Sequence, residues 1–212
     1  MISEPATLVT DYLLAIFTAV LAFRLLRAAD RADRSGIARE QRWWSAAFAL
    51  TAVAGASGGT VHGFRHALEP ALVDLLWVVS LESLIGASFA VVGGAIAFAE
   101  FGDAARSRAT FVAGLMFAAY ALWLVGHPVF LSAIVAYGAA FAVLVAIRLR
   151  VRPLDASGRL ILWGVAVSVA AAAIQQSGWA LHRYFNHNDL YHVVQAVGVW
   201  LLYRGAVLSR SG

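Results

Sequence analysis

Apolar residues run along this chain in seven long stretches, which short polar segments separate. We place the stretches at residues 8–28, 43–66, 70–98, 109–126, 128–148, 160–182 and 189–208. Each is close to the ~20 residues that an α-helix needs to cross a hydrocarbon core of ~30 Å. The pattern therefore predicts an all-α fold in which residues 1–212 form a single domain, an integral membrane bundle of seven transmembrane helices.

The composition agrees with this interpretation. Of the 212 residues, 61% are hydrophobic and 13% are charged, whereas a soluble domain has about 25% charged residues. We expect an integral protein of a bacterial plasma (inner) membrane, with membrane lipid as its partner. The isoelectric point near 10.0 does not indicate a nucleic-acid partner, because the basic residues gather at the ends of the apolar stretches, where membrane topology explains them.

Two residue types are missing from the chain, cysteine and lysine. Without cysteine there is no disulfide, no thiolate metal site and no cysteine nucleophile. Without lysine there is no Schiff-base chemistry, including the attachment of retinal.

Arginine is distributed unequally between the two ends of the predicted bundle. One end has only Arg65 and Arg183. The segments at the other end contain Arg24, Arg27, Arg31, Arg34, Arg39, Arg42, Arg106, Arg108, Arg148, Arg150, Arg152, Arg159, Arg204 and Arg210. Because basic loops stay in the cytoplasm, we expect the N-terminus outside and the C-terminus in the cytoplasm. On the outer side, Pro70 and Pro128 each suit the first turn of a helix.

In this topology every histidine lies at the outer end. The six are His62, His66, His127, His182, His187 and His192. In "HGFRHALE", His62, His66 and Glu69 lie at i, i+4 and i+7, and they share one face if the second helix continues to Pro70. The sequence therefore predicts a polar cluster at the end of the second helix.

A second polar cluster opens the seventh helix, in "ALHRYFNHNDLYHVVQ". Asp189, His192 and Gln195 share one face of this helix at spacings of three residues. Two helix ends therefore offer imidazoles and carboxylates at the same depth.

These side chains are the ligands that zinc takes when thiolates are absent. We take His62, His66, His187 and His192 as candidate zinc ligands. A zinc ion lowers the pKa of its bound water to roughly 7, and Asp74, one turn into the third helix, is the candidate general base. The residues placed around this site are Glu69, Ser57, Asp189 and Gln195.

Structural interpretations of the same polar residues stay open. A histidine at the membrane interface often only donates a hydrogen bond there, and His127 in "GHPV" fits a turn. Asn186, Asn188 or Asp189 can cap the seventh helix. Glu82, in the middle of the third stretch, is either an acid bonded between helices or part of a cavity or proton path. Gln175 and Gln176 can bond a lipid headgroup or another helix.

The arrangement resembles the alkaline ceramidase and adiponectin/progestin-receptor (CREST-like) superfamily of seven-helix membrane hydrolases. The similarity rests on "GTVHG" at the end of the second stretch, Asp74 in the third and "NDLYHVVQ" in the seventh. It implies bound zinc and hydrolysis of lipid amides, with His62 and His192 as ligands and Asp74 as the family's aspartate.

Two positions depart from that pattern. Asn188 stands where the superfamily has the first histidine of its seventh-helix motif, and Gly58 stands where it has a serine, with Ser57 adjacent. The third zinc ligand would then be His66, His182 or His187.

We therefore expect a zinc-dependent membrane hydrolase that acts on a lipid amide or ester at the extracytoplasmic side. Three alternatives stay open. The first is a seven-helix receptor for a lipid or small ligand, or a histidine-based sensor, that binds without hydrolysis. The second is a haem-binding electron carrier. The third is a transporter, although the sequence has no clear pair of broken helices.

Overall fold

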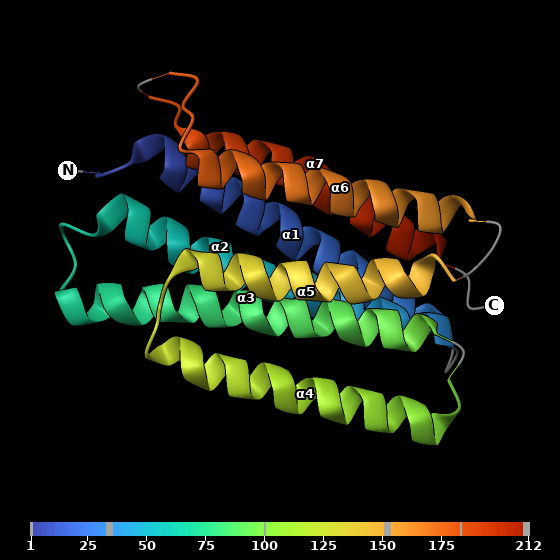
Figure 1. Ribbon diagram of the computed structural model, residues 1–212. Helices are drawn as coiled ribbons and strands as arrows, with labels where there is room; N and C mark the ends of the chain where they lie inside the picture. Colours follow the sequence, from blue (N-terminus) through green and yellow to red (C-terminus); the bar gives the residue numbers. More distant parts are fainter. Residues whose placement is uncertain (1, 33–35, 100, 151–153, 183, 210–212) are drawn as a thin grey trace.

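The computed structural model describes residues 2–32, 36–99, 101–150, 154–182 and 184–209. The described residues form seven α-helices and no sheet (Figure 1). The helices are α1 (Pro5–Arg31), α2 (Gly36–Phe64), α3 (Pro70–Phe98), α4 (Asp103–Val125), α5 (Phe130–Arg148), α6 (Ala156–Ser177) and α7 (His187–Leu208). The predicted all-α fold is confirmed.

Five helices are long and apolar enough to cross a membrane: α1, α3, α4, α5 and α6. Many of their large apolar side chains point away from the bundle, among them Leu122, Met116 and Phe111 of α4, which are 78%, 68% and 66% exposed. An apolar outer surface of this extent is typical of lipid contact. Helices α2 and α7 fall outside this set; polar residues occur within the first two turns of each, such as Arg39 and Glu40 in α2 and Asn188 and Asp189 in α7.

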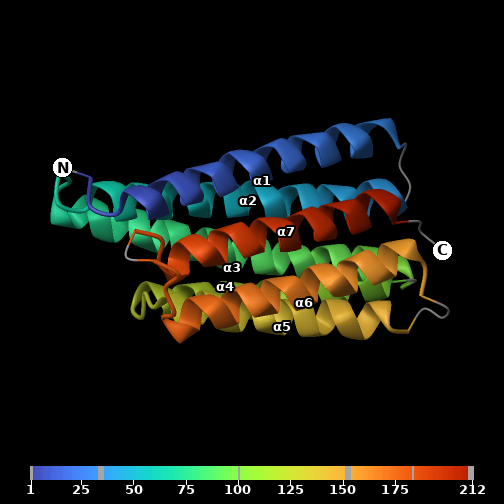
Figure 2. The same cartoon turned by 90° about the horizontal axis from the view of Figure 1, so that it is seen from above.

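The helices run roughly parallel or antiparallel to one another, and α1–α2, α2–α3 and α6–α7 form the largest interfaces (Figures 1 and 2). Glycines allow two of these pairs to approach closely, as in other membrane bundles. A Cβ at Gly198 of α7 would lie 2.5 Å from Ser168 Oγ of α6, and a Cβ at Gly59 of α2 would lie 2.8 Å from Asp11 Cβ of α1. Helix α4 packs at the edge, against α3.

The connections divide the bundle into two ends. We call the "histidine end" the one formed by the start of α1 and by the α2–α3, α4–α5 and α6–α7 connections. All six histidines lie there, as predicted. We call the opposite end, where α1 ends and α4 and α6 begin, the "arginine end"; among the described arginines only Arg65 lies elsewhere. Arg34, Arg152, Arg183 and Arg210 lie outside the described residues.

Several helix boundaries differ from the predicted ones, with consequences for the candidate site. Helix α2 ends at Phe64, so His66 lies in a turn and not on the helical face of His62. Helix α6 ends at Ser177 because Gly178 adopts a left-handed conformation with φ 66°. His182, expected to end that helix, lies in the following loop. Pro70 opens α3 as predicted, whereas α5 begins at Phe130, after Pro128.

One arginine at the arginine end is not at the surface. Arg148 was expected to be one of the cytoplasmic loop cations, but its side chain is 1% exposed and donates a hydrogen bond to Glu40, which is also buried. The guanidinium lies 3.5 Å from the centre of the Phe98 ring. Ser209, just after α7, donates to Glu40 Oε2 at 2.5 Å. A buried ion pair therefore ties α2 to α5 and to the end of α7.

Candidate functional site

A cavity of about 490 Å³ lies inside the bundle toward the histidine end. Every helix except α4 contributes to its wall. Most of the wall is apolar, with Leu14, Leu84, Phe130, Ile134 and Phe141 among the larger side chains. Polar side chains also reach it: Asp11, Thr51, His62, Ser80, Tyr137, Ser168, Gln175, His187, Asn188, Tyr191, His192 and Gln195.

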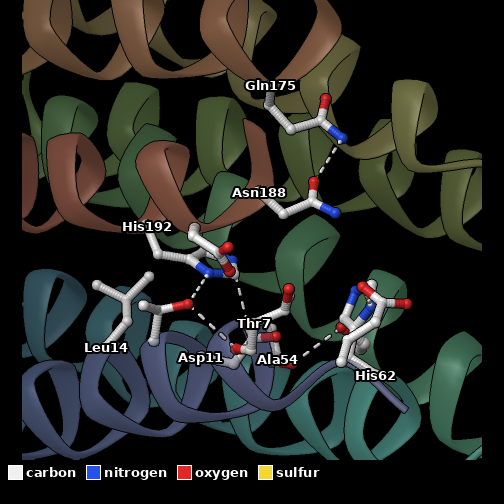
Figure 3. A network of polar contacts seen from close by, with 12 residues as sticks. Thr7, Asp11, Leu14, Ala54, His62, Gln175, Asn188 and His192 are labelled. Atoms are coloured by element: carbon white, nitrogen blue, oxygen red, sulfur yellow. Dashed lines mark hydrogen bonds and ion pairs between the residues drawn. The ribbon is translucent and has the colours of Figure 1, made fainter. Parts of the chain in front are cut away.

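The central polar contact joins α1 to α7. Asp11 Oδ1 lies 3.1 Å from His192 Nε2, and Thr10 Oγ1 lies 2.9 Å from His192 Nδ1. Figure 3 shows the imidazole held between the two helices. Asp11 and His192 are 5% and 8% exposed. Both ring nitrogens are therefore occupied, and the position and tilt of the ring are fixed from two sides.

The second carboxylate oxygen of Asp11 has no such partner. Asp11 Oδ2 is buried and makes no hydrogen bond to any described residue, while Asp11 itself lines the cavity. A buried carboxylate oxygen without a partner is costly, by about 1–3 kcal/mol or more. Asp11 Oδ2 is therefore an acceptor that the described residues leave unsatisfied.

His62 reaches the same cavity from the last turn of α2. Its Nδ1 lies 3.2 Å from Glu4 Oε2, in the residue before α1, and its ring meets the Trp77 ring edge-on at 6.3 Å between centroids. Trp77 in turn donates from Nε1 to the carbonyl oxygen of Pro128 at 2.9 Å. The N-terminal residues, α2 and α3 therefore meet around this imidazole.

The start of α7 is a capping structure. The Asn186 side chain accepts from the backbone N–H groups of Asn188 and Asp189, and the Asp189 carboxylate accepts from the Asn186 N–H at 2.6 Å. This reciprocal arrangement satisfies three N–H groups that a helix N-terminus otherwise leaves free. Asp189 is 1% exposed and does not line the cavity, so the capping interpretation of this residue is confirmed.

Two amide contacts join α6 to α7 along the cavity wall. Gln175 Nε2 donates to Asn188 Oδ1 at 3.4 Å (Figure 3), and Gln195 Nε2 donates to Ser168 Oγ at 3.2 Å. Gln175 therefore bonds another helix, one of the two alternatives left open by the sequence. Asn188, the position where the resemblance requires a histidine, faces the cavity with its Oδ1 engaged and its amide N–H groups available.

The structure separates the predicted site residues into two groups. His62, His187, His192 and Gln195 line the cavity. Five others do not: His66, Glu69 and Asp74 are exposed, and Ser57 and Asp189 are buried away from it. The exposure of His66 and Glu69 follows from the end of α2 at Phe64, and Asp74 lies on an outward face of α3. Gly58, adjacent to Ser57, is the residue that faces the cavity.

Three other polar residues singled out from the sequence, His127, His182 and Glu82, do not line the cavity. His127 stacks on Trp123 with ring centroids 4.4 Å apart, as expected of a turn residue. His182 is exposed and forms an isolated bridge with Phe185. Glu82 is half-buried, does not line the cavity, and its Oε1 has no hydrogen-bond partner among the described residues.

The cavity wall does not present a preformed zinc site. In the described ranges, no group of three or more His, Asp or Glu side chains is arranged to hold a metal ion. Asp11 and His192 contact each other, and His62 contacts Glu4, so a zinc ion would have to replace these pairings. The zinc stays a prediction, and the chemistry proposed below uses only side chains of the chain itself.

Sequence comparison assigns the chain to a protein family. Residues 6–211 match the profile described as "Family of unknown function (DUF6962)". The chain belongs to this family. No curated protein and no solved structure matches it. The DUF6962 assignment covers all seven helices but gives no activity, so the function has to be argued from the cavity.

Sequence reasoning missed two members of the central contact, Asp11 and Thr10. One signal for Asp11 was present, because an acid inside an apolar stretch is expensive to bury and is often functional. No spacing rule links residues 10 and 11 to residue 192, and only the packing of α1 on α7 brings them together.

Proposed function

We propose that all seven helices cross the membrane, with the histidine end outside a bacterial inner membrane. Two observations support this. Helices α2 and α7 run beside the five apolar helices over the same length (Figures 1 and 2), and the described arginines other than Arg65 lie at the opposite end. Basic residues at helix ends favour the cytoplasmic side.

We further propose that the cavity binds one amphiphilic, lipid-like molecule whose head group donates a hydrogen bond. The observation that carries this proposal is Asp11 Oδ2, a buried acceptor without a partner in a mostly apolar cavity. The volume, about 490 Å³, falls within the roughly 300–1,000 Å³ of known ligand pockets. The head group would lie between α1 and α7, and the tail along the apolar wall from Leu84 to Phe141.

The position of the opening supports a ligand from the membrane. Gly138 of α5 and Val169 of α6 line the cavity and are also exposed on the outside of the bundle. A Cβ at Gly138 would meet no atom within 4 Å. We therefore infer that the cavity opens between α5 and α6, where lipid tails would lie.

Hydrolysis of an amide or ester in the bound molecule is the second candidate, and the Asp11–His192 contact favours it. In this reaction Asp11 Oδ2 accepts a proton from a water molecule while the water oxygen bonds to the carbonyl carbon. Asn188, whose Oδ1 is engaged by Gln175, donates an amide N–H to the carbonyl oxygen. The carbon–nitrogen or carbon–oxygen bond then breaks, and the proton on Asp11 passes to the leaving amine or alcohol. His192 holds Asp11 in place.

A pair of matched ligands tests binding. A long-chain N-acyl amino alcohol offers hydroxyl and amide donors, whereas the methyl ester of the same acid offers none. We expect the first compound to raise the melting temperature of the detergent-solubilised protein more than the second. Equal shifts would show that Asp11 does not select the head group.

The same samples separate the candidate functions. Release of the free fatty acid, measured by mass spectrometry and lost in Asp11→Asn, supports the hydrolase; binding without release supports a receptor. Elemental analysis and a visible spectrum of the protein test the zinc and haem expectations directly. The resemblance to the ceramidase-like superfamily stays a prediction until these measurements are made.

A further inference from the structure

A second hollow, separate from the cavity, lies at the arginine end between α2, α3 and α4. Its volume is about 480 Å³. The polar residues that line it are Arg39, Asp103, Arg106, Ser107 and Thr110, and the apolar ones are Trp43, Gly93, Ile96, Ala97 and Phe111. Charged and hydroxyl groups therefore share one hollow with an apolar floor, on a part of the bundle where α4 packs only at the edge.

Arg106 is held in this hollow by two fixed contacts. Its Nη1 donates to Asp103 Oδ1 at 2.7 Å and its Nη2 donates to the carbonyl oxygen of Phe101 at 2.7 Å. Its Nε is buried and has no hydrogen-bond partner in the described part of the chain. The two contacts use two of the five N–H groups of the guanidinium, and the other three have no partner among the described residues.

Arg39 supplies a second guanidinium from the first turns of α2. It is exposed and forms no ion pair with any described residue. The described charged groups of the hollow are the guanidinium groups of Arg39 and Arg106 and the carboxylate of Asp103. Their net charge is one positive unit. Guanidinium groups bind phosphate oxygens with strong, charge-assisted hydrogen bonds.

The apolar floor indicates what the phosphate would be attached to. The Trp43 ring lies so close to α3 that a Cβ at Gly93 would be 2.5 Å from it, and Phe111 of α4 is 66% exposed on the outer surface. An acyl chain that leaves a phosphate at Arg39 and Arg106 would continue along these aromatic residues. Basic pockets between membrane helices on the cytoplasmic side are known to bind lipid head groups.

We propose that this hollow binds the phosphodiester head group of a phospholipid, with the guanidinium groups of Arg39 and Arg106 as the phosphate ligands and Ser107 and Thr110 as further donors. The single net positive charge favours a lipid whose head group carries one negative charge in total, such as phosphatidylglycerol, over a zwitterionic one. This proposal stands independently of what the cavity at the histidine end binds.

Native mass spectrometry of the full-length protein in detergent tests the proposal, with phosphatidylglycerol, phosphatidylcholine and inorganic phosphate as separate probes. The test variant is Arg39→Gln, because Arg39 has no ion pair with a described residue to lose; Arg106→Gln is the second variant. The matched control is Arg108→Gln, an exposed arginine of α4 outside the hollow.

We expect the wild type to bind one phosphatidylglycerol molecule, and to bind it more tightly than phosphatidylcholine. Each test variant should bind phosphatidylglycerol about tenfold more weakly than the wild type does, since one charge-assisted hydrogen bond corresponds to roughly this factor. The control should bind as the wild type does. Equal affinity for the two lipids, or equal loss in Arg39→Gln and Arg108→Gln, would overturn the proposal. Displacement of the lipid by millimolar inorganic phosphate would show that free phosphate, and not a lipid, is the ligand.

Discussion

Asp11 and His192 come from opposite ends of the chain and contact each other inside the bundle, with Oδ1 3.1 Å from Nε2. Thr10, the residue before Asp11, contacts the other ring nitrogen. One turn of α1 therefore fixes both sides of a single imidazole on α7. The arrangement leaves Asp11 Oδ2 as a buried oxygen without a hydrogen-bond partner among the described residues, in a side chain that lines the cavity.

The two aspartates that bear on catalysis give a direct comparison. Asp74 is the general base that the sequence predicts, but it is exposed and outside the cavity, whereas Asp11 is buried and lines it. If the protein hydrolyses a lipid amide or ester, Asp11→Asn should lower the rate at least about a hundredfold, the typical contribution of a general base. Asp74→Asn should leave the rate within about twofold. Release of fatty acid from the purified variants measures both, and loss of activity in Asp74→Asn alone would favour the original assignment.

Entry from the membrane can be tested at Gly138. A leucine there would extend into the space between α5 and α6 without a clash at Cβ, so Gly138→Leu should fold normally and slow ligand uptake. Ala139→Leu, on the neighbouring exposed position outside the cavity wall, is the matched control. The uptake of a fluorescent single-chain amphiphile should slow severalfold in the first variant only. The same uptake rate in both would mean that ligands enter elsewhere.

The buried Glu40–Arg148 pair predicts a large effect on stability far from the cavity. Glu40→Gln leaves the guanidinium of Arg148 buried without its counter-charge, and such losses cost about 3–5 kcal/mol. Thermal unfolding in detergent should show a clear decrease in melting temperature. Arg42→Gln removes an exposed contact with Asp30, 3.7 Å long, and should change stability by less than about 1 kcal/mol. Similar effects in both variants would contradict the buried ion pair.

Close packing of α6 on α7 makes a further prediction about stability. A methyl group added by Gly198→Ala would lie 2.5 Å from Ser168 Oγ and 3.2 Å from the Ser168 backbone nitrogen. The helices would have to separate, at a cost of about 1–3 kcal/mol for overpacking. Gly102→Ala, where the added Cβ meets nothing within 4 Å, should be close to neutral. Unfolding of the two variants by heat compares them, and a neutral Gly198→Ala would argue against this interface.

The hydrophobic pattern of the sequence predicted the helices and the end of the bundle at which the histidines lie. The apolar stretches predicted all seven helices, and five of these helices are long and apolar enough to cross a membrane. Placement of the histidines at one end followed from connectivity alone. The face shared by His62, His66 and Glu69 depended on a helix that reaches Pro70, and that prediction was wrong because α2 ends at Phe64.

Contacts between distant segments lay beyond such reasoning. Arg148 was assigned to the cytoplasmic surface because positive-inside counting treats every arginine at a helix end alike, and nothing in the spacing pairs it with Glu40. The contact of Asp11 with His192 depends on how α1 packs against α7. Sequence patterns within a single helix cannot predict either the Glu40–Arg148 contact or the Asp11–His192 contact, because each joins two helices that are distant in the sequence.

The central claim is that Asp11 holds the head group of an amphiphile inside the bundle, and its most direct test is the ligand that co-purifies with the protein. Mass spectrometry of organic extracts from the wild type, Asp11→Asn and Asp74→Asn would identify and quantify it. We predict close to one amphiphile with a hydroxyl or amide donor per wild-type chain, retained in Asp74→Asn and lost in Asp11→Asn. An equal amount in all three proteins, or a bound molecule without a hydrogen-bond donor, would contradict the account.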